Sequence, residues 1–174
     1  MALRTDGTVV AWGGNTYGQT NVPMWLSNVT AIAGGANHSL ALCSDGTVVA
    51  WGQSTYGQTN VPMWLSNAVS VAGGGSHSVA LRSDGTVVAW GKSFNGQTNV
   101  PAGLTNVISI VGGDSHSLAL RSDGSVVTWG QYYNGFGYVP MYIPSWLTSA
   151  IIIGGEENHA VAICQRFKIG RAHV

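Results

Sequence analysis

The stretch MWLSNAVSVAGGGSHSVALRSDGTVVAWGKSFNGQTNVP, residues 63–101, decides the fold because nearly the same words stand on both sides of it. Tryptophan, aspartate and proline each recur at a step of 39 residues, at Trp12, Trp51, Trp90 and Trp129, at Asp6, Asp45, Asp84 and Asp123, and at Pro23, Pro62, Pro101 and Pro140. Histidine keeps the step at His38, His77 and His116, and His159 follows 43 residues later. A fixed period of this length indicates that one supersecondary unit is stacked several times.

Three strands fit each unit. In residues 63–101 they are AVSVAGG at 68–74, HSVAL at 77–81 and TVVAW at 86–90, which are rich in small and β-branched residues. The Asp-Gly pair between the second and third strands predicts a tight hairpin turn, because it tolerates positive φ angles. No helical period runs for long, so the sequence predicts an all-β chain.

Two architectures stack such units, a closed propeller and an open solenoid. A glycine pair ends the first strand of each complete unit, at 34–35, 73–74 and 112–113. Crowding near a propeller axis would leave little space for side chains there, which favours the propeller.

The composition excludes several classes of protein. Seven basic residues balance seven acidic ones among 174, so we expect no binding to nucleic acid, which requires a basic surface. Apolar runs such as residues 150–153 are far too short to span a membrane. The only cysteines, Cys43 and Cys164, occupy the same slot in their units, where other units have arginine. Because two blades would separate them, a mutual disulfide is not expected.

The pattern GGxxHSLAL-SDGTVVAWG-x-GQTNVP resembles the regulator of chromosome condensation repeat. It is most similar to the short bacterial form of that repeat, also seen in a propeller-type β-lactamase inhibitor protein. The resemblance covers about residues 1–165 and implies a β-propeller of about seven blades. The founding nuclear member is a nucleotide exchange factor for a small GTPase, which gives one alternative function.

The period predicts the limits of the units. We expect complete units at 24–62, 63–101 and 102–140, and partial units at 1–23 and 141–165, so that the chain forms an incomplete arc of about four blades. Residues 166–174 match no unit, and 168–174 correspond to one reading frame of a sequencing adapter, so we interpret this tail as an artefact. The low charge favours an extracellular or cell-surface location as a hypothesis.

Histidine, aspartate and tryptophan are the residues in which chemistry would be sought. Four histidines suggest a metal site, but each occupies the same place in its own unit, which favours structural roles with bonds to backbone near the glycine turn. The four aspartates each precede a turn glycine, which favours turns over acid-base catalysis. The tryptophans at the ends of the third strands are expected to pack between blades, with the indole N–H bonded to a carbonyl. We therefore expect that the chain is not an enzyme and that it binds no metal or cofactor.

Candidate binding residues are those that change between units on a constant scaffold. Four loop pairs vary, at Thr16 and Tyr17, Thr55 and Tyr56, Phe94 and Asn95, and Tyr133 and Asn134. A second set, Trp25, Trp64 and Trp146, follows the prolines, whereas the unit at 102–140 has Ala102-Gly103 there. Each set also has an explanation without binding. For the first set it is neutral sequence drift in exposed loops, and for the second it is packing of the tryptophans under the loop.

These residues lead to three hypotheses of function. The first is a non-enzymatic module whose loop rim binds another protein. The second is a carbohydrate-binding or cell-surface module that uses the aromatic residues. The third is the exchange factor that the resemblance implies.

Overall fold

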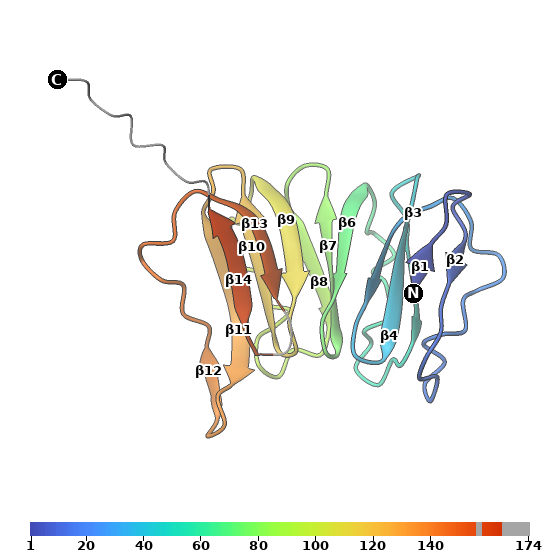
Figure 1. Cartoon of the computed structure of the whole chain (residues 1–174), viewed down its shortest axis with the longest axis horizontal. Coiled ribbons are helices and arrows are strands. Elements are labelled where there is room, and N and C mark those ends of the chain that lie inside the picture. Colours follow the sequence, from blue (N-terminus) through green and yellow to red (C-terminus); the bar gives the residue numbers. More distant parts are fainter. Residues whose placement is uncertain (156–157, 165–174) are drawn as a thin grey trace.

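The computed structural model describes residues 1–155 and 158–164, and its regular structure consists of β-strands. The strands form five antiparallel sheets, here called blades 1 to 5, which follow one another along the chain and stand side by side (Figure 1). Blade 1 holds β1 (Ala2–Leu3) and β2 (Val9–Val10); blade 2 holds β3 (Val29–Gly34), β4 (His38–Cys43) and β5 (Val48–Gly52); blade 3 holds β6 (Ala68–Gly73), β7 (His77–Arg82) and β8 (Val87–Gly91). Blade 4 holds β9 (Val107–Gly112), β10 (His116–Arg121), β11 (Val126–Tyr133) and β12 (Tyr138–Pro140), and blade 5 holds β13 (Ala150–Gly155) and β14 (Ala160–Cys164). The all-β prediction and the three-stranded unit of blades 2 and 3 are confirmed.

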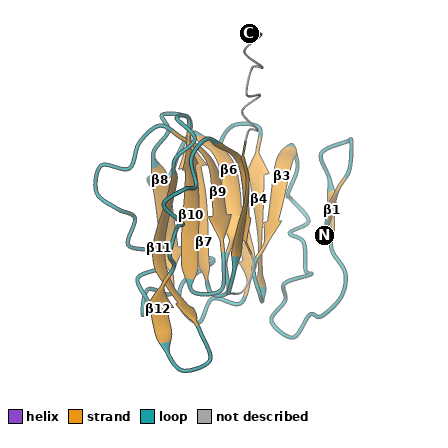
Figure 2. Cartoon of the chain, turned by 60° about the vertical axis from the view of Figure 1, so that its left-hand side comes forward, coloured by secondary structure: helices purple, strands orange, loops and turns teal. Residues whose placement is uncertain are grey.

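A fourth strand distinguishes blade 4. The strand β12 pairs with the end of β11, with Tyr133 opposite Tyr138, and the resulting hairpin extends beyond the lower end of the blades (Figures 1 and 2). This loop reads GQYYNGFGYVP where the preceding one reads GKSFNGQTNVP, so Phe136 and Tyr138 stand where Gln97 and Asn99 are. The segments on the two sides of Asn134-Gly135 pair as a hairpin instead.

In the hairpin turns between the second and third strands, glycine is the residue that adopts a positive φ. In blade 2 the N–H of Gly46 donates to the carbonyl of Cys43, and the φ of Gly46 is +81°. Asp45 is not among the residues with positive φ, so only the second residue of the Asp-Gly pair uses the left-handed region, as in a turn followed by a glycine bulge.

The apolar cores lie between consecutive blades. Along β4, Leu40 and Leu42 pack against Trp90 of blade 3, while Ala41 between them faces the other way and packs with Leu3 of blade 1. Successive side chains of a strand point to opposite faces, so a large residue next to a small one fills both interfaces. The same arrangement recurs from blade 3 to blade 4.

Glycine lets the first strands of successive blades, β3, β6 and β9, here called the inner strands, approach one another. A Cβ on Gly73 would lie 2.6 Å from the backbone nitrogen of Gly35, and one on Gly112 would lie 2.8 Å from that of Gly74. The predicted crowding is therefore confirmed at these two glycines, because a side chain there would collide with the backbone of the preceding blade.

The interpretation of residues 166–174 as an artefactual tail lies outside the described residues. Within the described ranges, no helix is long and apolar enough to cross a membrane. Cys43 and Cys164 are both free thiols.

We expect Gly73→Ala to lower the free energy of unfolding by about 1–3 kcal/mol, because the added methyl group forces two blades apart. Gly137→Ala is the matched control, since nothing lies within 4 Å of a Cβ there. Urea unfolding of both variants checks this. Equal stability of the two would contradict the close approach of the inner strands.

Candidate functional site

The blades present two opposite faces. The loop face carries the connections from the third strand to the next unit, such as residues 53–60 and 92–99, and the glycine-rich turns after each first strand. The hairpin face carries the Asp-Gly turns and the residues that precede each first strand; the N–H of Ala68, for example, donates to the carbonyl of Gly46. Any binding residue belongs to one of these faces or to the outer edge.

A glutamine shapes each regular loop of the loop face, and it is buried at Gln58 and Gln97 and half-buried at Gln19. The side chain of Gln58 has no solvent exposure, and its Oε1 accepts the backbone N–H of Tyr56 at 3.0 Å. Gln97 does the same for Asn95, and Gln19 for Tyr17. The variable residue of each loop is therefore fixed through its backbone, while its side chain is left to vary.

The backbone of the same glutamine ties the loop to the next blade. The carbonyl oxygen of Gln58 accepts the Ser78 hydroxyl at 2.8 Å and the Trp90 indole N–H at 2.9 Å, both from blade 3. Gln19 is held in the same way by Ser39 and Trp51, and Gln97 by Ser117 and Trp129. Each loop is thus anchored by the blade that follows it.

A buried histidine completes the link. Nε2 of His38 lies 3.0 Å from Oγ of Ser78, and Nε2 of His77 lies 2.9 Å from Oγ of Ser117. The Ser78 hydroxyl donates its single proton to the carbonyl of Gln58, so it must accept a hydrogen bond from Nε2–H of His38. The neutral tautomer with the proton on Nε2 follows.

Burial keeps these histidines neutral. It lowers the pKa of His38 to about 4 and that of His77 to about 3, from the 6.5 usual for histidine. Protonation would add a second ring N–H at Nδ1, which is buried and has no hydrogen-bond partner among the described residues.

Three structural expectations need correction. The hydrogen bond of His38 and His77 goes to a serine of the next blade and not to backbone near the glycine turn. Trp12 is 65% exposed and not packed between blades, and among the described residues its indole N–H has no carbonyl like that of Gln19, which accepts the indole N–H of Trp51. His159 is exposed on blade 5, beyond which no described blade lies.

The interface between blades 4 and 5 lacks the serine. Ala160 follows His159 where Ser39, Ser78 and Ser117 follow the other histidines. Both ring nitrogens of His116 are buried without a partner among the described residues. This interface therefore depends on its apolar core of Leu118, Leu120, Ala150 and Ile153.

Aromatic side chains from adjacent loops meet on the loop face. The rings of Tyr56 and Phe94 lie 5.7 Å apart in an edge-to-face arrangement, and the Lys92 ammonium lies 5.3 Å from the Tyr56 ring centre. Phe94 is 80% exposed and Tyr56 42%. Thr55 is exposed beside them, and Asn95 is half-buried.

The other variable loop residues lie on the same face but do not join this cluster. Thr16 and Tyr17 are exposed in the loop of the first unit. Tyr133 contacts Tyr138, with ring centres 5.5 Å apart, and Asn134 caps the β11–β12 hairpin by accepting the N–H groups of Phe136 and Gly137.

The second predicted set lies on the hairpin face. Trp25, Trp64 and Trp146 are 72%, 67% and 75% exposed, so they are not packed under a loop. The buried anchor of each segment is the next residue or its equivalent, such as Leu26 and Leu65. The two predicted sets thus belong to opposite faces and do not form one site.

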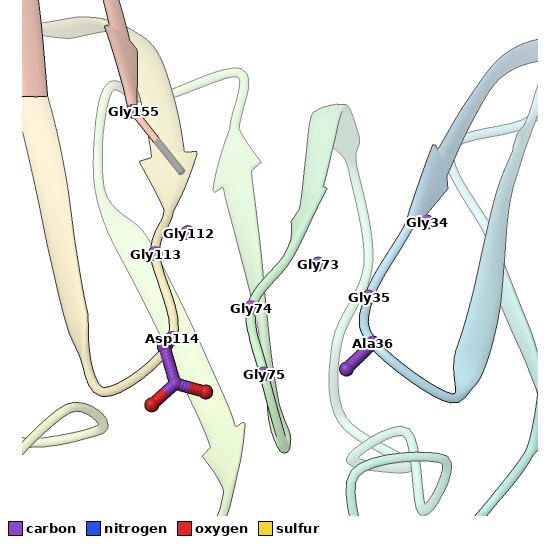
Figure 3. Close-up of a pocket in the computed structure, with 10 residues that line it drawn as sticks. All are labelled: Gly34, Gly35, Ala36, Gly73, Gly74, Gly75, Gly112, Gly113, Asp114 and Gly155. Atoms are coloured by element: carbon purple, nitrogen blue, oxygen red, sulfur yellow. The ribbon is translucent and has the colours of Figure 1, made fainter. Parts of the chain in front are cut away.

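The groove along the inner strands offers little chemistry. Figure 3 shows that it is lined by glycine backbone, with Ala36 and Asp114 as its only other residues. The Asp114 carboxylate accepts the Ser115 hydroxyl at 3.0 Å. Among the described residues no group of three His, Cys, Asp or Glu side chains could hold a metal.

The repeated aspartates stabilise turns. Oδ1 of Asp45 accepts both the N–H and the hydroxyl of Thr47, at 2.9 and 2.7 Å, and Asp6, Asp84 and Asp123 accept from the equivalent residues. These hydrogen bonds lower the pKa of each carboxyl below its usual value, and the bond from the hydroxyl has the largest effect. Lowered carboxyl pKa values in turns are opposite to what a general acid requires.

Sequence reasoning missed the serine and the glutamine of the inter-blade link. Both kept the 39-residue step, at Ser39, Ser78 and Ser117 and at Gln19, Gln58 and Gln97. Their period was the available signal, but polar residues next to turns resemble ordinary loop residues.

A family model for the regulator of chromosome condensation (RCC1) repeat matches residues 1–19, 29–58, 68–97 and 107–137. The matched segments run from the first strand to the loop glutamine of the regular units and leave out the Met-Trp segments. No curated protein matches the chain significantly.

Solved structures with the same fold include Prp20p from Saccharomyces cerevisiae, described with its binding properties to Gsp1p and histones, at 22% identity and a TM-score of 0.70 over 87% of this chain and 50% of that one. The complex of Kap60 with yeast RCC1 (Prp20) matches at 22% identity and 0.73, over 93% of this chain and 51% of that one. The ectodomain of the Physcomitrella patens receptor kinase CR4 matches at 23% identity and 0.65, over 83% of this chain and 40% of that one. The chain thus spans about half the length of the Prp20 structures.

We expect Ser78→Ala to lower the free energy of unfolding by about 1–2 kcal/mol, because it leaves the buried Nε2–H of His38 without an acceptor. Ser83→Ala, in an exposed turn of the same blade, is the control and should change stability by less than about 0.5 kcal/mol. Chemical denaturation compares the two. A silent Ser78→Ala would contradict the inter-blade hydrogen bond.

Stability should fall as the pH is lowered from 6.5 to 4. In this range the unfolded histidines take up protons and the buried ones do not, so each of His38 and His77 removes up to about 1.4 kcal/mol per pH unit. His77→Gln should flatten the profile by about one histidine's share, as measured by urea unfolding at several pH values. Parallel profiles for the two proteins would contradict this.

Proposed function

Because the chain belongs to the regulator of chromosome condensation (RCC1) repeat family, we propose that it is a protein-binding β-propeller module that uses its loop face. The observation that carries the proposal is the pair of Tyr56 and Phe94, which is exposed and yet held by fixed loops. Exposed aromatic side chains on a rigid support are typical of binding hot spots, because little conformational entropy is lost when they are buried.

The cation beside the pair adds to its specificity. Lys92 reaches the rings of both Tyr56 and Phe94, so the cluster combines an apolar surface with one positive charge. A protein surface with an apolar centre and an acidic edge would complement it.

The structural relatives support protein binding in general terms. Prp20p is described with Gsp1p and histones, and in complex with Kap60. At 22% identity these structures share the fold, and their partners are not transferred to this chain.

The test is affinity capture from an extract of the source cells, followed by measurement of affinity for the purified partner. We expect the double variant Tyr56→Ser, Phe94→Ser to bind at least about tenfold more weakly, since aromatic anchors typically contribute more than 1 kcal/mol each. Trp64→Ser removes an equally exposed aromatic residue from the opposite face and should bind as the wild type.

Two results would overturn the proposal. One is a partner that binds the double variant as tightly as the wild type. The other is a glycan, and not a protein, whose binding depends on Tyr56 and Phe94. Accelerated nucleotide release from a small GTPase would support the exchange-factor alternative.

A further inference from the structure

One position on the hairpin face alternates between arginine and cysteine. In blades 1 to 4 it immediately precedes the Ser-Asp-Gly turn, or Thr-Asp-Gly in blade 1, and it is occupied by Arg4, Cys43, Arg82 and Arg121; Cys164 ends the last strand of blade 5 at the corresponding sequence position. The remaining turn residues are nearly constant, so blade 3 shows what the same surroundings hold when an arginine is present.

In blades 3 and 4 the arginine bonds to polar groups near the turn, which are those of its own turn in blade 3 and a carbonyl of the preceding segment in blade 4. Nη1 of Arg82 lies 3.2 Å from Oδ2 of Asp84 and 3.4 Å from the hydroxyl of Thr86. In blade 4, Nε of Arg121 donates to the carbonyl of Thr105 at 3.1 Å. A guanidinium therefore fits between the turn and the segment that leads into the first strand.

In blade 2 this place is a pocket. Cys43 is shorter than the arginine of blade 3 and is one of the residues that line the pocket, together with Trp25, Asp45 and Thr47. Oδ1 of Asp45 is occupied by Thr47, whereas Oδ2, the atom that Arg82 meets in blade 3, has no hydrogen bond among the described residues. The pocket thus has the acceptors of the arginine site without the arginine.

The charge of Asp45 is correspondingly uncompensated. The pKa of Asp84 is lowered first by the hydrogen bonds of Thr86 and then by the charge of Arg82, and Arg121 acts in the same way on Asp123. For Asp45, only the hydrogen bonds of the turn lower the pKa. The pocket is therefore complementary to a cation.

We propose that the blade 2 pocket binds the side chain of an arginine from a partner protein, whose guanidinium takes the place that Arg82 fills in blade 3. Its acceptors are Oδ2 of Asp45, the Thr47 hydroxyl and the carbonyl of Ser27, which corresponds to Thr105. A planar guanidinium can meet several such acceptors at once, which a lysine ammonium does less well.

Trp25 supplies the remaining wall. Trp25 lines the pocket and is 72% exposed, so its ring is accessible for stacking on the guanidinium of an incoming arginine. The equivalent residue is Trp64 in blade 3 and Gly103 in blade 4. The site lies on the face opposite the Tyr56-Phe94 pair, and it does not depend on the proposed function of that pair.

The test uses the whole chain, labelled with ¹⁵N and kept reduced, with N-acetyl-arginine methylamide as the probe. We expect a saturable shift of the Trp25 indole resonance with a Kd on the order of 1 mM, as befits a single side chain. The citrulline analogue has the same shape without the charge and should give no saturable shift. Equal binding of the citrulline analogue would overturn the proposal.

Substitutions of the alternating position provide matched variants. Cys43→Arg should abolish the Trp25 shift without loss of folding, because arginine is native at this position in blades 1, 3 and 4. Arg82→Cys should create a second site that shifts the Trp64 indole. Arg121→Cys should add no site of comparable affinity, because Gly103 offers no ring. Asp45→Asn should weaken binding roughly tenfold.

Three outcomes would contradict the proposal. They are an unchanged Trp25 shift in Cys43→Arg, no shift of the Trp64 indole in Arg82→Cys, and a Trp25 site that takes a neutral oligosaccharide but not the arginine probe. Dispersed amide spectra of Cys43→Arg and Arg82→Cys serve as the check that each variant is folded.

Discussion

The carbonyl oxygen of each loop glutamine, shared by a serine and a tryptophan of the next blade, is the interaction on which the rest of the structure depends. A three-stranded blade cannot bury both of its faces, so its stability comes from its neighbours. At Gln58 the apolar contact of Leu40 with Trp90 and the polar contact of Ser78 with His38 occur in one interface. The blades are therefore held together, and the loop is fixed, by the same residues.

Because the scaffold residues are buried, the exposed ones are released to vary. On the loop face Gln58 holds the backbone of Tyr56. The equivalent position in the next loop is Asn95, which Gln97 holds in the same way. On the hairpin face the alternation of Arg82 with Cys43 opens a pocket without altering the turn. Each face thus carries a surface that differs from blade to blade on constant supports.

The sequence period was sufficient to predict the strands, the inter-blade tryptophans and the crowded glycines, because each repeats the same physical constraint. It did not predict the strand β12, which pairs with β11 in a hairpin where the other units have a folded loop. Trp12 and His159 were expected to be buried like their equivalents and are exposed. Burial of these residues depends on contacts with a neighbouring blade, which a pattern within one unit does not reveal. The pocket beside Cys43 required the side-chain positions of Arg82, since the substitution alone does not show which space is vacated.

The ring nitrogens of His38 and His77 test the inter-blade link most directly. Long-range ¹H–¹⁵N correlation spectra of the whole chain at pH 5.5 should show both histidines neutral, with the proton on Nε2. Protons on Nδ1, or titration of both rings near the ordinary pKa of 6.5, would contradict the account, because neither state can donate from a neutral, buried Nε2 to the serine of the next blade.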